Sequence, residues 1–289
     1  MENSETLKEL VREKYGAIAR DSSSCCGPTS CCGPTNGENV FLDISDDYKG
    51  KEGYVEEADL GLGCGIPTEA ADLKPGQTVL DLGSGAGNDV FVARQIVGET
   101  GKVIGVDMTP DMIKKARENA ARQGYTNVEF RLGEIEALPV GGSSIDRVVS
   151  NCVLNLIPNK QGAFSEMIRV LRPGGSFGVS DVVLEGEFPE ALKEAAELYV
   201  GCVSGAIQKN EYLEMLRDTG FENVRVTKEK TIVIPDDLVA AYLNEEQRNA
   251  LKQSKVRVLS VTVQGFKPLK SEGCCTPLAE AGACCAPAA

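Results

Sequence analysis

From residue 77 onward, short apolar runs alternate with stretches that have helical periodicity. The apolar runs are TVLDLG, KVIGVDM, VEFRLG, IDRVVSNCVLNL and GSFGVSDVVL, and the helical stretches include DVFVARQIVGE, PDMIKKARENAARQG and QGAFSEMIRVLR. Apolar runs bounded by Gly and Pro, with helical patterns of roughly 10 to 15 residues between them, indicate βαβ units. We therefore predict an α/β fold in which a mostly parallel sheet carries helices on both faces.

The first of these runs leads directly into a glycine-rich segment, DLGSGAGND. Gly83, Gly85 and Gly87 would let the chain turn sharply and approach a ligand, and the following helix N-terminus would offer free N–H groups. A dinucleotide fingerprint has the spacing G-x-G-x-x-G, whereas this segment has G-x-G-x-G. Asp81 would repel a pyrophosphate but suits a cofactor that carries an ammonium and a sulfonium. A nicotinamide cofactor is therefore the weaker alternative.

Acidic and apolar residues follow the next two predicted strands. Asp107 ends the second strand, where a carboxylate can accept hydrogen bonds from both hydroxyls of a ribose. Met108 could pack against a purine. Glu134 and Ile135 follow the third strand, where a carboxylate or a backbone carbonyl could accept from an adenine amino group. The four residues complete a candidate site for a nucleoside-containing cofactor.

Taken in order and at strand ends, these residues resemble the class I S-adenosylmethionine-dependent methyltransferases over residues 66–185, and the RPGG turn at 172–175 is typical of that family. The resemblance implies S-adenosylmethionine as cofactor. It also implies a Rossmann-like, seven-stranded, mostly parallel sheet whose last strand is antiparallel. KVRVLSVTVQGFK is the expected last strand. Asn151, at the end of the fourth strand, joins the candidate cofactor-binding residues.

The cysteine and histidine counts restrict the chemistry further. The chain has 11 cysteines and no histidine, so an imidazole base and the common mixed Cys/His zinc site are excluded. The N-terminal sequence MENSETLKELVREKYG lacks a basic stretch followed by an apolar run, and no apolar run approaches the roughly 20 residues that span a bilayer. We therefore expect a cytoplasmic protein without a membrane partner, whose cysteines are ligands or reactive groups rather than disulfides.

The formal net charge of −13 argues against a nucleic-acid partner, because phosphate binding needs clustered Lys and Arg. A small-molecule substrate fits better.

Methyl transfer to oxygen or nitrogen usually needs a base, and this chain has no histidine to serve as one. Methyl transfer to a soft atom with a free lone pair needs no proton removed, and trivalent arsenic held by thiolates is such an atom.

Cysteines stand at several suggestive places. Cys64 lies in LGLGCGIP, Cys152 in SNCVLNL at the carboxyl end of the fourth strand, and Cys202 in YVGCVSGA. Ligands of open α/β sheets collect outside the carboxyl ends of the strands, so Cys152 should face the transferable group. The alternative for any single cysteine is a small buried apolar side chain. The tandem repeat SCCGPTSCCGPT adds two adjacent pairs: Cys25, Cys26, Cys31 and Cys32.

The motifs YGAIAR...CC, LGLGCG, DLGSGAGND, GVDMT, SNCVLNL and GCVSGA together resemble the bacterial arsenite methyltransferases over most of residues 10–225. This resemblance implies that arsenite and then methylarsenite are the substrates. It implies that Cys152 and Cys202 bind trivalent arsenic, that Cys64 is a third ligand, and that a fourth cysteine lies in the N-terminal loop. The repeat leaves that fourth position ambiguous among its four cysteines, of which Cys31 and Cys32 are taken as the candidates.

The same resemblance implies a disulfide that an external thiol reductant, such as thioredoxin or glutathione, must reduce. We also expect a monomer.

Two alternative functions remain open at this point. A C-methyltransferase acting on a quinone-like molecule would leave the cysteine pairs unexplained, and a thiol-rich metalloid-sequestering protein would leave the cofactor motifs without a role.

The sequence divides into four predicted regions. Residues 1–65 hold a Cys-rich loop preceded by an amphipathic helix with Leu7, Leu10, Val11 and Ile18 on one stripe. Residues 66–185 form the cofactor-binding domain, and residues 186–270 form an α+β arsenic-binding region that completes the sheet. Residues 271–289 form a flexible tail with two further pairs, whose role is either arsenite capture or none in catalysis: Cys274, Cys275, Cys284 and Cys285.

Overall fold

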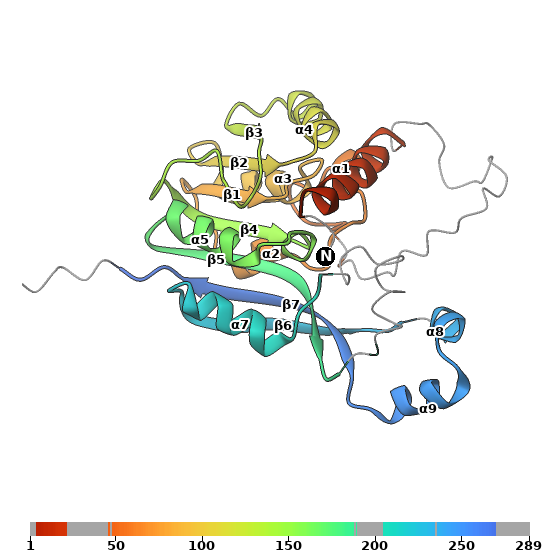
Figure 1. Ribbon diagram of the computed structural model, residues 1–289. Helices are drawn as coiled ribbons and strands as arrows, with labels where there is room; N and C mark the ends of the chain where they lie inside the picture. Colours follow the sequence, from red (N-terminus) through yellow and green to blue (C-terminus); the bar gives the residue numbers. More distant parts are fainter. Residues whose placement is uncertain are drawn as a thin grey trace, which may run out of the picture.

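A seven-stranded sheet in the order β3-β2-β1-β4-β5-β7-β6 forms the centre of the computed structural model (Figure 1). The strands are β1 (Thr78–Leu82), β2 (Lys102–Asp107), β3 (Val128–Leu132), β4 (Ile145–Asn151), β5 (Leu171–Glu185), β6 (Glu222–Ile232) and β7 (Arg257–Phe266). The structure describes residues 4–21, 46, 48–187, 189, 205–234 and 236–269. Cys202, the tandem pairs and the pairs of the tail, on which several predictions rest, lie outside these residues.

The strand directions match the predicted methyltransferase sheet. β1 pairs in parallel with β2 and β4, β2 with β3, and β4 with β5. β7 runs antiparallel to both of its neighbours, β5 and β6. The predicted antiparallel last strand is therefore confirmed, and it lies between the two strands that precede it in sequence.

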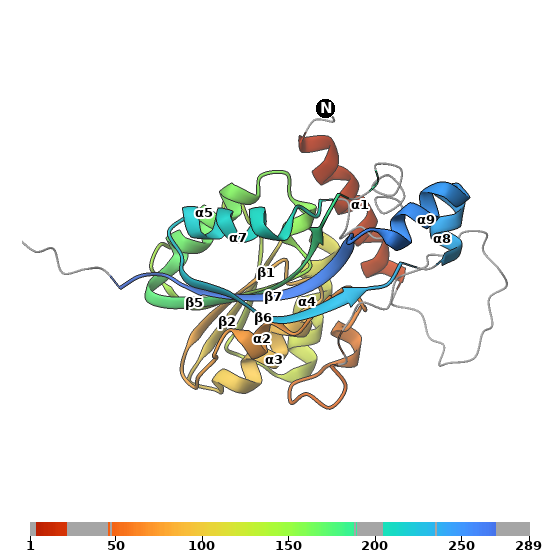
Figure 2. The same ribbon diagram turned by 90° about the horizontal axis from the view of Figure 1, so that it is seen from below.

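Helices cover both faces of the sheet (Figure 2). They are α1 (Ser4–Asp21), α2 (Pro67–Ala70), α3 (Asn88–Val97), α4 (Pro110–Gln123), α5 (Lys160–Val170), α7 (Lys209–Asp218), α8 (Asp236–Tyr242) and α9 (Glu245–Gln253), with 3-10 turns η1 (Glu56–Ala58) and η2 (Leu154–Leu156). One hydrophobic cluster joins α3 and α4 to the sheet and another joins α5 and α7 to it. No helix in the described part of the chain is both long and apolar enough to cross a bilayer.

The segment DDLVAAYLNEEQRNALKQ forms two helices separated near Asn244. The Asn244 side chain accepts a hydrogen bond from the backbone N–H of Gln247, and the Gln247 side chain accepts one from the backbone N–H of Asn244. This reciprocal capping box satisfies two amides that would otherwise lack partners at a helix start. Local capping thus begins α9, which lies with α8 away from the sheet (Figure 1).

A carboxyl group is buried within the central strand β5. Asp181 has no solvent exposure; it accepts hydrogen bonds from the backbone N–H of Val182 at 3.0 Å and from the Tyr212 hydroxyl at 3.4 Å. Burial raises the pKa of Asp181 to about 7, although these hydrogen bonds and nearby Lys160 act in the opposite direction. Folding therefore favours the protonated form of this side chain.

The raised pKa predicts how stability depends on pH. Relative to the unfolded chain, the contribution of Asp181 is fully present below its ordinary pKa and is lost as the pH rises to about 7. Asp181→Asn removes this loss. Between pH 5 and pH 8, we expect the free energy of unfolding of the variant to rise relative to the parent by about 2.6 kcal/mol, at about 1.4 kcal/mol per pH unit below the folded-state pKa. Urea unfolding at both pH values measures this change, and a constant difference would contradict it.

Candidate functional site

The main pocket lies where β1, β2 and β4 end. It is also lined by residues of α1, of the loop before α2, and of the segment after β3. Of the residues predicted to bind a cofactor, all but Gly87 line this pocket: Asp81, Gly83, Gly85, Asp107, Met108, Glu134, Ile135 and Asn151. Cys152 lines it too. The structure therefore brings the predicted cofactor residues and one predicted substrate ligand into a single cavity.

The glycine loop is fixed by hydrogen bonds to β2 and by packing against Val153. The backbone N–H groups of Gly83 and Ser84 both donate to the Val106 carbonyl, at 2.8 and 3.0 Å. Gly83 has φ +66°, and a Cβ there would lie 2.4 Å from a Val153 methyl group. Gly87, with φ +103°, caps the start of α3 and has no room for a Cβ. Glycine is required at both positions, for backbone conformation and for close packing.

Two polar side-chain atoms in this pocket fit a bound polar molecule. Ser84 Oγ and Asn88 Oδ1 are buried and have no hydrogen-bond partner within the described residues. Both residues line the pocket. Because buried polar atoms in native proteins are nearly always hydrogen-bonded, these atoms are suited to contact a ligand.

Three carboxyl groups around the pocket favour a ligand with positive charge. Burial raises the pKa of Asp81, and the nearby Asp89 and Asp107 raise it further. Burial also raises the pKa of Asp107, against the effect of hydrogen bonds from the backbone N–H groups of Thr109 and Gly85. An ammonium or sulfonium group nearby would stabilise these carboxylates, as opposite charges in a poorly solvated site do.

Helix α1 forms one wall of the pocket through Val11 and Tyr15. It is held by ion pairs: Lys8 Nζ lies 2.7 Å from a Glu134 oxygen and 2.8 Å from a Glu136 oxygen. Arg12 also pairs with Glu134, at 2.7 Å. The neighbouring Lys8 is the main cause that lowers the pKa of Glu134. The Glu134 side chain therefore contacts α1, and its predicted contact with an adenine stays a prediction.

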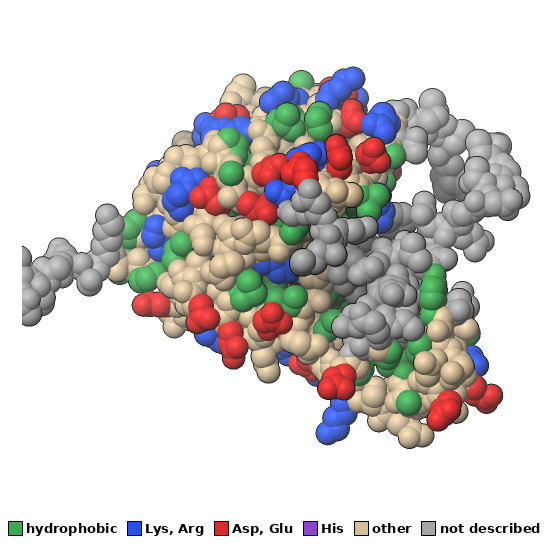
Figure 3. Space-filling view, in the orientation of Figure 1, with side chains coloured by type: hydrophobic (Ala, Val, Ile, Leu, Met, Phe, Trp, Pro, Cys, Tyr) green, Lys and Arg blue, Asp and Glu red, His purple; other side chains and the backbone are tan. Residues whose placement is uncertain are grey.

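The predicted apolar stripe of α1 is only partly buried. Leu10 is 60% exposed, whereas Lys8 is 8% exposed and lies between two glutamates. Basic and acidic side chains are accordingly interspersed over this part of the surface (Figure 3). The predicted helix is confirmed, but Leu10 of its apolar stripe is exposed, while ion pairs hold Lys8 inward.

The two cysteines in the described part of the chain, Cys64 and Cys152, are both buried. Cys152 directly follows β4 with φ +58°, and its backbone N–H donates to the Ser180 carbonyl of β5 at 2.8 Å. Both cysteines belong to one hydrophobic cluster, which also contains Val182 and Ile232. The structure thus brings these two predicted arsenic ligands to the same end of the sheet, whereas Cys202 and the other cysteines lie outside the described residues.

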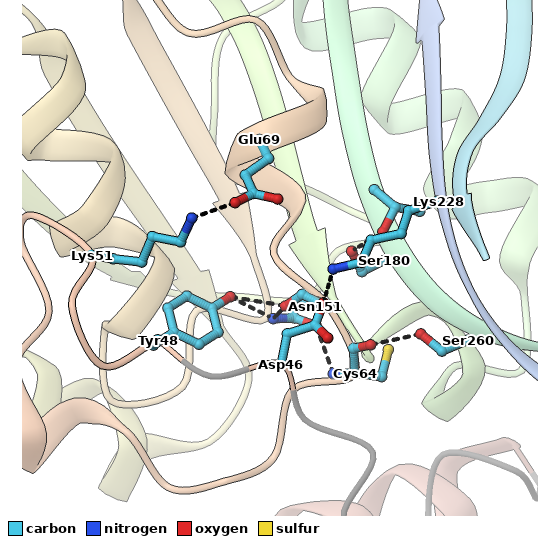
Figure 4. Close-up of polar contacts among 11 residues, drawn as sticks. Asp46, Tyr48, Lys51, Cys64, Glu69, Asn151, Ser180, Lys228 and Ser260 are labelled. Carbon is cyan, nitrogen blue, oxygen red and sulfur yellow. Dashed lines mark hydrogen bonds and ion pairs between the residues drawn. The ribbon is translucent and has the colours of Figure 1, made fainter. Parts of the chain in front are cut away.

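A polar network connects Cys64 to the pocket (Figure 4). Asn151 Oδ1 accepts a hydrogen bond from the Cys64 backbone N–H at 3.0 Å, and Asn151 Nδ2 donates to Asp89 at 3.0 Å. The Tyr48 hydroxyl donates to the other oxygen of Asp89 at 2.7 Å. Burial raises the pKa of Asp89 to about 6, while these two hydrogen bonds lower it.

Sequence reasoning missed Tyr48 and Asp89 as residues of the site. Asp89 stands at the end of DLGSGAGND, immediately after the glycine loop, so its position offered a signal. Tyr48 lies in a segment without a recognisable motif, DDYKGKEGY. Only the folded structure shows that it reaches Asp89.

The chain is similar to known methyltransferases. Residues 73–220 match the family model described as a methyltransferase domain. The chain is 41% identical to an arsenite methyltransferase of Halobacterium salinarum over 276 residues, which cover 93% of this chain and 68% of the relative. It is 34% identical to an arsenite methyltransferase of Aquipseudomonas alcaligenes over 253 residues, which cover 83% of this chain and 69% of that relative.

Among solved structures, the chain resembles an arsenic(III) S-adenosylmethionine methyltransferase from Chlamydomonas reinhardtii. The TM-score is 0.61 at 37% sequence identity, and the match covers 71% of this chain and 68% of the other. The likeness therefore extends to both the sequence and the arrangement of the sheet.

Proposed function

The chain belongs to the arsenite methyltransferases, and from this membership we propose that it transfers the methyl group of S-adenosylmethionine to trivalent arsenic held by its cysteine thiolates. The observation that carries the proposal is the position of Cys152. It follows β4 directly and lines the same pocket as Asp81 and the glycine loop. A thiol that can bind a soft metalloid therefore lies at the edge of the cofactor site.

The pocket residues fit S-adenosylmethionine, which supplies a methyl group on a positively charged sulfur when bound. We assign the ammonium group to Asp81 and the ribose hydroxyls to Asp107, in the order the strands present them. Gly83 and Gly85 give the backbone its close approach. In this proposal the apolar side chains of Met108 and Ile135, which line the pocket, pack on the purine.

The cysteines have the chemistry to hold arsenic, because thiolates prefer soft or borderline centres. In this proposal Cys152 and Cys202 bind arsenic, Cys64 supplies a third thiolate for arsenite, and Cys31 or Cys32 takes part in thiolate exchange. The lone pair of arsenic(III) attacks the methyl carbon while the bond from that carbon to the sulfonium sulfur breaks, so the rest of the cofactor leaves as a neutral thioether and no base has to remove a proton. Burial of Cys64 and Cys152 keeps water from the reacting atoms.

Each methyl transfer oxidises arsenic from the trivalent to the pentavalent state. Two thiolates of the chain return two electrons to arsenic by joining as a disulfide, and an external thiol such as thioredoxin or glutathione then reduces that disulfide. The cycle needs a reducing compartment, so we place the enzyme in the cytoplasm. We propose that it acts there as a monomer on arsenite and then on methylarsenite.

Serine substitutions test the thiol assignment. We expect Cys152→Ser to lower methylation of both arsenite and methylarsenite by at least about 100-fold, because it removes a ligand required in both steps. Cys64→Ser should abolish methylation of arsenite and spare that of methylarsenite, which has one fewer coordination position for a thiolate. The measurement is arsenic speciation after incubation with S-adenosylmethionine and a thiol reductant. Ser165→Ala, at an exposed position of α5 outside the pocket, is the control, and wild-type rates for Cys152→Ser would refute the assignment.

An aspartate substitution tests the cofactor assignment. Asp107→Ala should weaken binding of S-adenosylmethionine by about 10- to 100-fold, since hydrogen bonds to a charged group contribute about 1.5–3 kcal/mol. Isothermal titration calorimetry measures this affinity directly. Asp111→Ala is the control, because Asp111 pairs with Arg20 in the ion pair between α4 and α1 and does not line the main pocket. An equal affinity for both variants would contradict the role of Asp107.

A further inference from the structure

The carboxamide of Asn151 contacts the chain on both sides of Cys64. Its oxygen accepts from the Cys64 N–H, and its nitrogen donates to the Gly65 carbonyl at 2.8 Å. The same nitrogen lies within hydrogen-bonding distance of Asp89 and of the Tyr48 hydroxyl, both at 3.0 Å. Every polar atom of the carboxamide is therefore engaged within the protein (Figure 4).

The chain at Cys64 is also held from the opposite direction. Ser260 of β7 donates from its hydroxyl to the Cys64 carbonyl at 2.6 Å. Both peptide groups that flank the Cys64 side chain thus have defined partners, Asn151 at the end of β4 and Ser260 within β7. These two hydrogen bonds fix the direction in which the thiol leaves the backbone.

Close packing explains two of the three glycines of LGLGCG, Gly63 and Gly65. A Cβ on Gly63 would lie 2.6 Å from Asn151 Nδ2, and a Cβ on Gly65 would lie 2.5 Å from Ser180 Oγ. Both distances are shorter than van der Waals contact allows, so any side chain at these positions would push the segment off the strand ends. The two glycines let Cys64 lie directly against β4 and β5.

Asp89 and Tyr48 orient the carboxamide. Asp89 lies in the first turn of α3, directly after the glycine loop, and accepts from both Asn151 and Tyr48. A carboxylate accepts only, so it fixes which end of the Asn151 side chain carries the nitrogen. The oxygen of Asn151 is then turned toward the Cys64 N–H. Tyr48 completes the arrangement by donating to Asp89 and contacting the Gly65 carbonyl at 3.0 Å.

We propose that Asn151, oriented by Asp89 and Tyr48, is a positioning residue that holds the Cys64 thiol within reach of arsenic bound at the neighbouring Cys152. The inference rests on the proposed function, in which Cys64 supplies the third thiolate for arsenite. It gives Asn151 a different role from the predicted contact with the cofactor. It also predicts that loss of the Asn151 side chain lowers the rate of methylation of arsenite more than that of methylarsenite.

The test compares two substrates in one variant. Asn151→Ala should lower the methylation rate with arsenite at least about tenfold more than the rate with methylarsenite. Tyr48→Phe, which removes a single hydroxyl, should also lower the ratio of the arsenite rate to the methylarsenite rate, by a smaller factor. Asn159→Ala is the matched control: Asn159 caps α5 through the Gly162 N–H, so its loss destabilises the chain without touching the Cys64 segment. Its ratio of rates should equal that of the parent.

A second readout does not depend on activity. The parent Cys64 is 1% exposed, so iodoacetamide should alkylate it slowly in the absence of substrates. In Asn151→Ala the segment loses its anchor, and mass spectrometry should find Cys64 alkylated at least about tenfold faster than in Asn159→Ala. Equal alkylation rates for the two variants would overturn the positioning role.

The outcomes separate this proposal from the proposed function. If the parent protein produces no methylated arsenic, the proposed function fails. If the parent is active but Asn151→Ala lowers both rates equally, the positioning role fails and the proposed function stands. A raised KM for S-adenosylmethionine with an unchanged ratio of substrate rates would instead make Asn151 a cofactor-binding residue.

Discussion

The parallel pairing of β1 with β2 and β4 is the constraint on which the rest of the site depends. In register, Asp81 of β1 lies beside Gly105 of β2 and Val149 of β4. The three strands therefore end at one edge, and whatever follows them in sequence must emerge there. This places the glycine loop, Asp107 and Cys152 around one pocket although they are far apart in the chain.

The same edge carries an electrostatic cost that shapes its surroundings. Asp81, Asp89 and Asp107 are poorly solvated, and burial raises the pKa of each. Hydrogen bonds from backbone N–H groups and from Tyr48 offset part of the cost of charging these carboxyl groups. A cationic ligand can offset the rest. Such a site gains affinity for a sulfonium cofactor because folding has already placed the carboxyl groups whose charged form that cation stabilises. This is the physical reason why an acidic chain can have a specific cofactor site without a basic residue near the loop.

Elements with strong local patterns were predictable from the sequence, and contacts between distant segments were not. The strands, the antiparallel β7 and the acidic strand ends follow from apolar periodicity, turn residues and family resemblance. The inward position of Lys8 depends on two glutamates more than 120 residues away, as the separation from Glu134 shows. The network of Tyr48, Asp89 and Asn151 joins three segments that no local pattern relates. Tertiary contacts of this kind decide which polar side chains a site uses.

The anchoring of Cys64 has a consequence for how thiolates exchange on arsenic. Both peptide groups beside this residue are hydrogen-bonded, and Gly63 and Gly65 lie against other side chains with no space for displacement. The Cys64 sulfur can therefore move mainly by rotation about its own side-chain bond. If arsenic must lose one thiolate and gain another between methylations, the larger rearrangement has to come from arsenic itself or from the other cysteines. Under the proposed function, a rigid Cys64 would hold the third thiolate for arsenite in one place, and arsenic would move away from it when the first methyl group takes that coordination position.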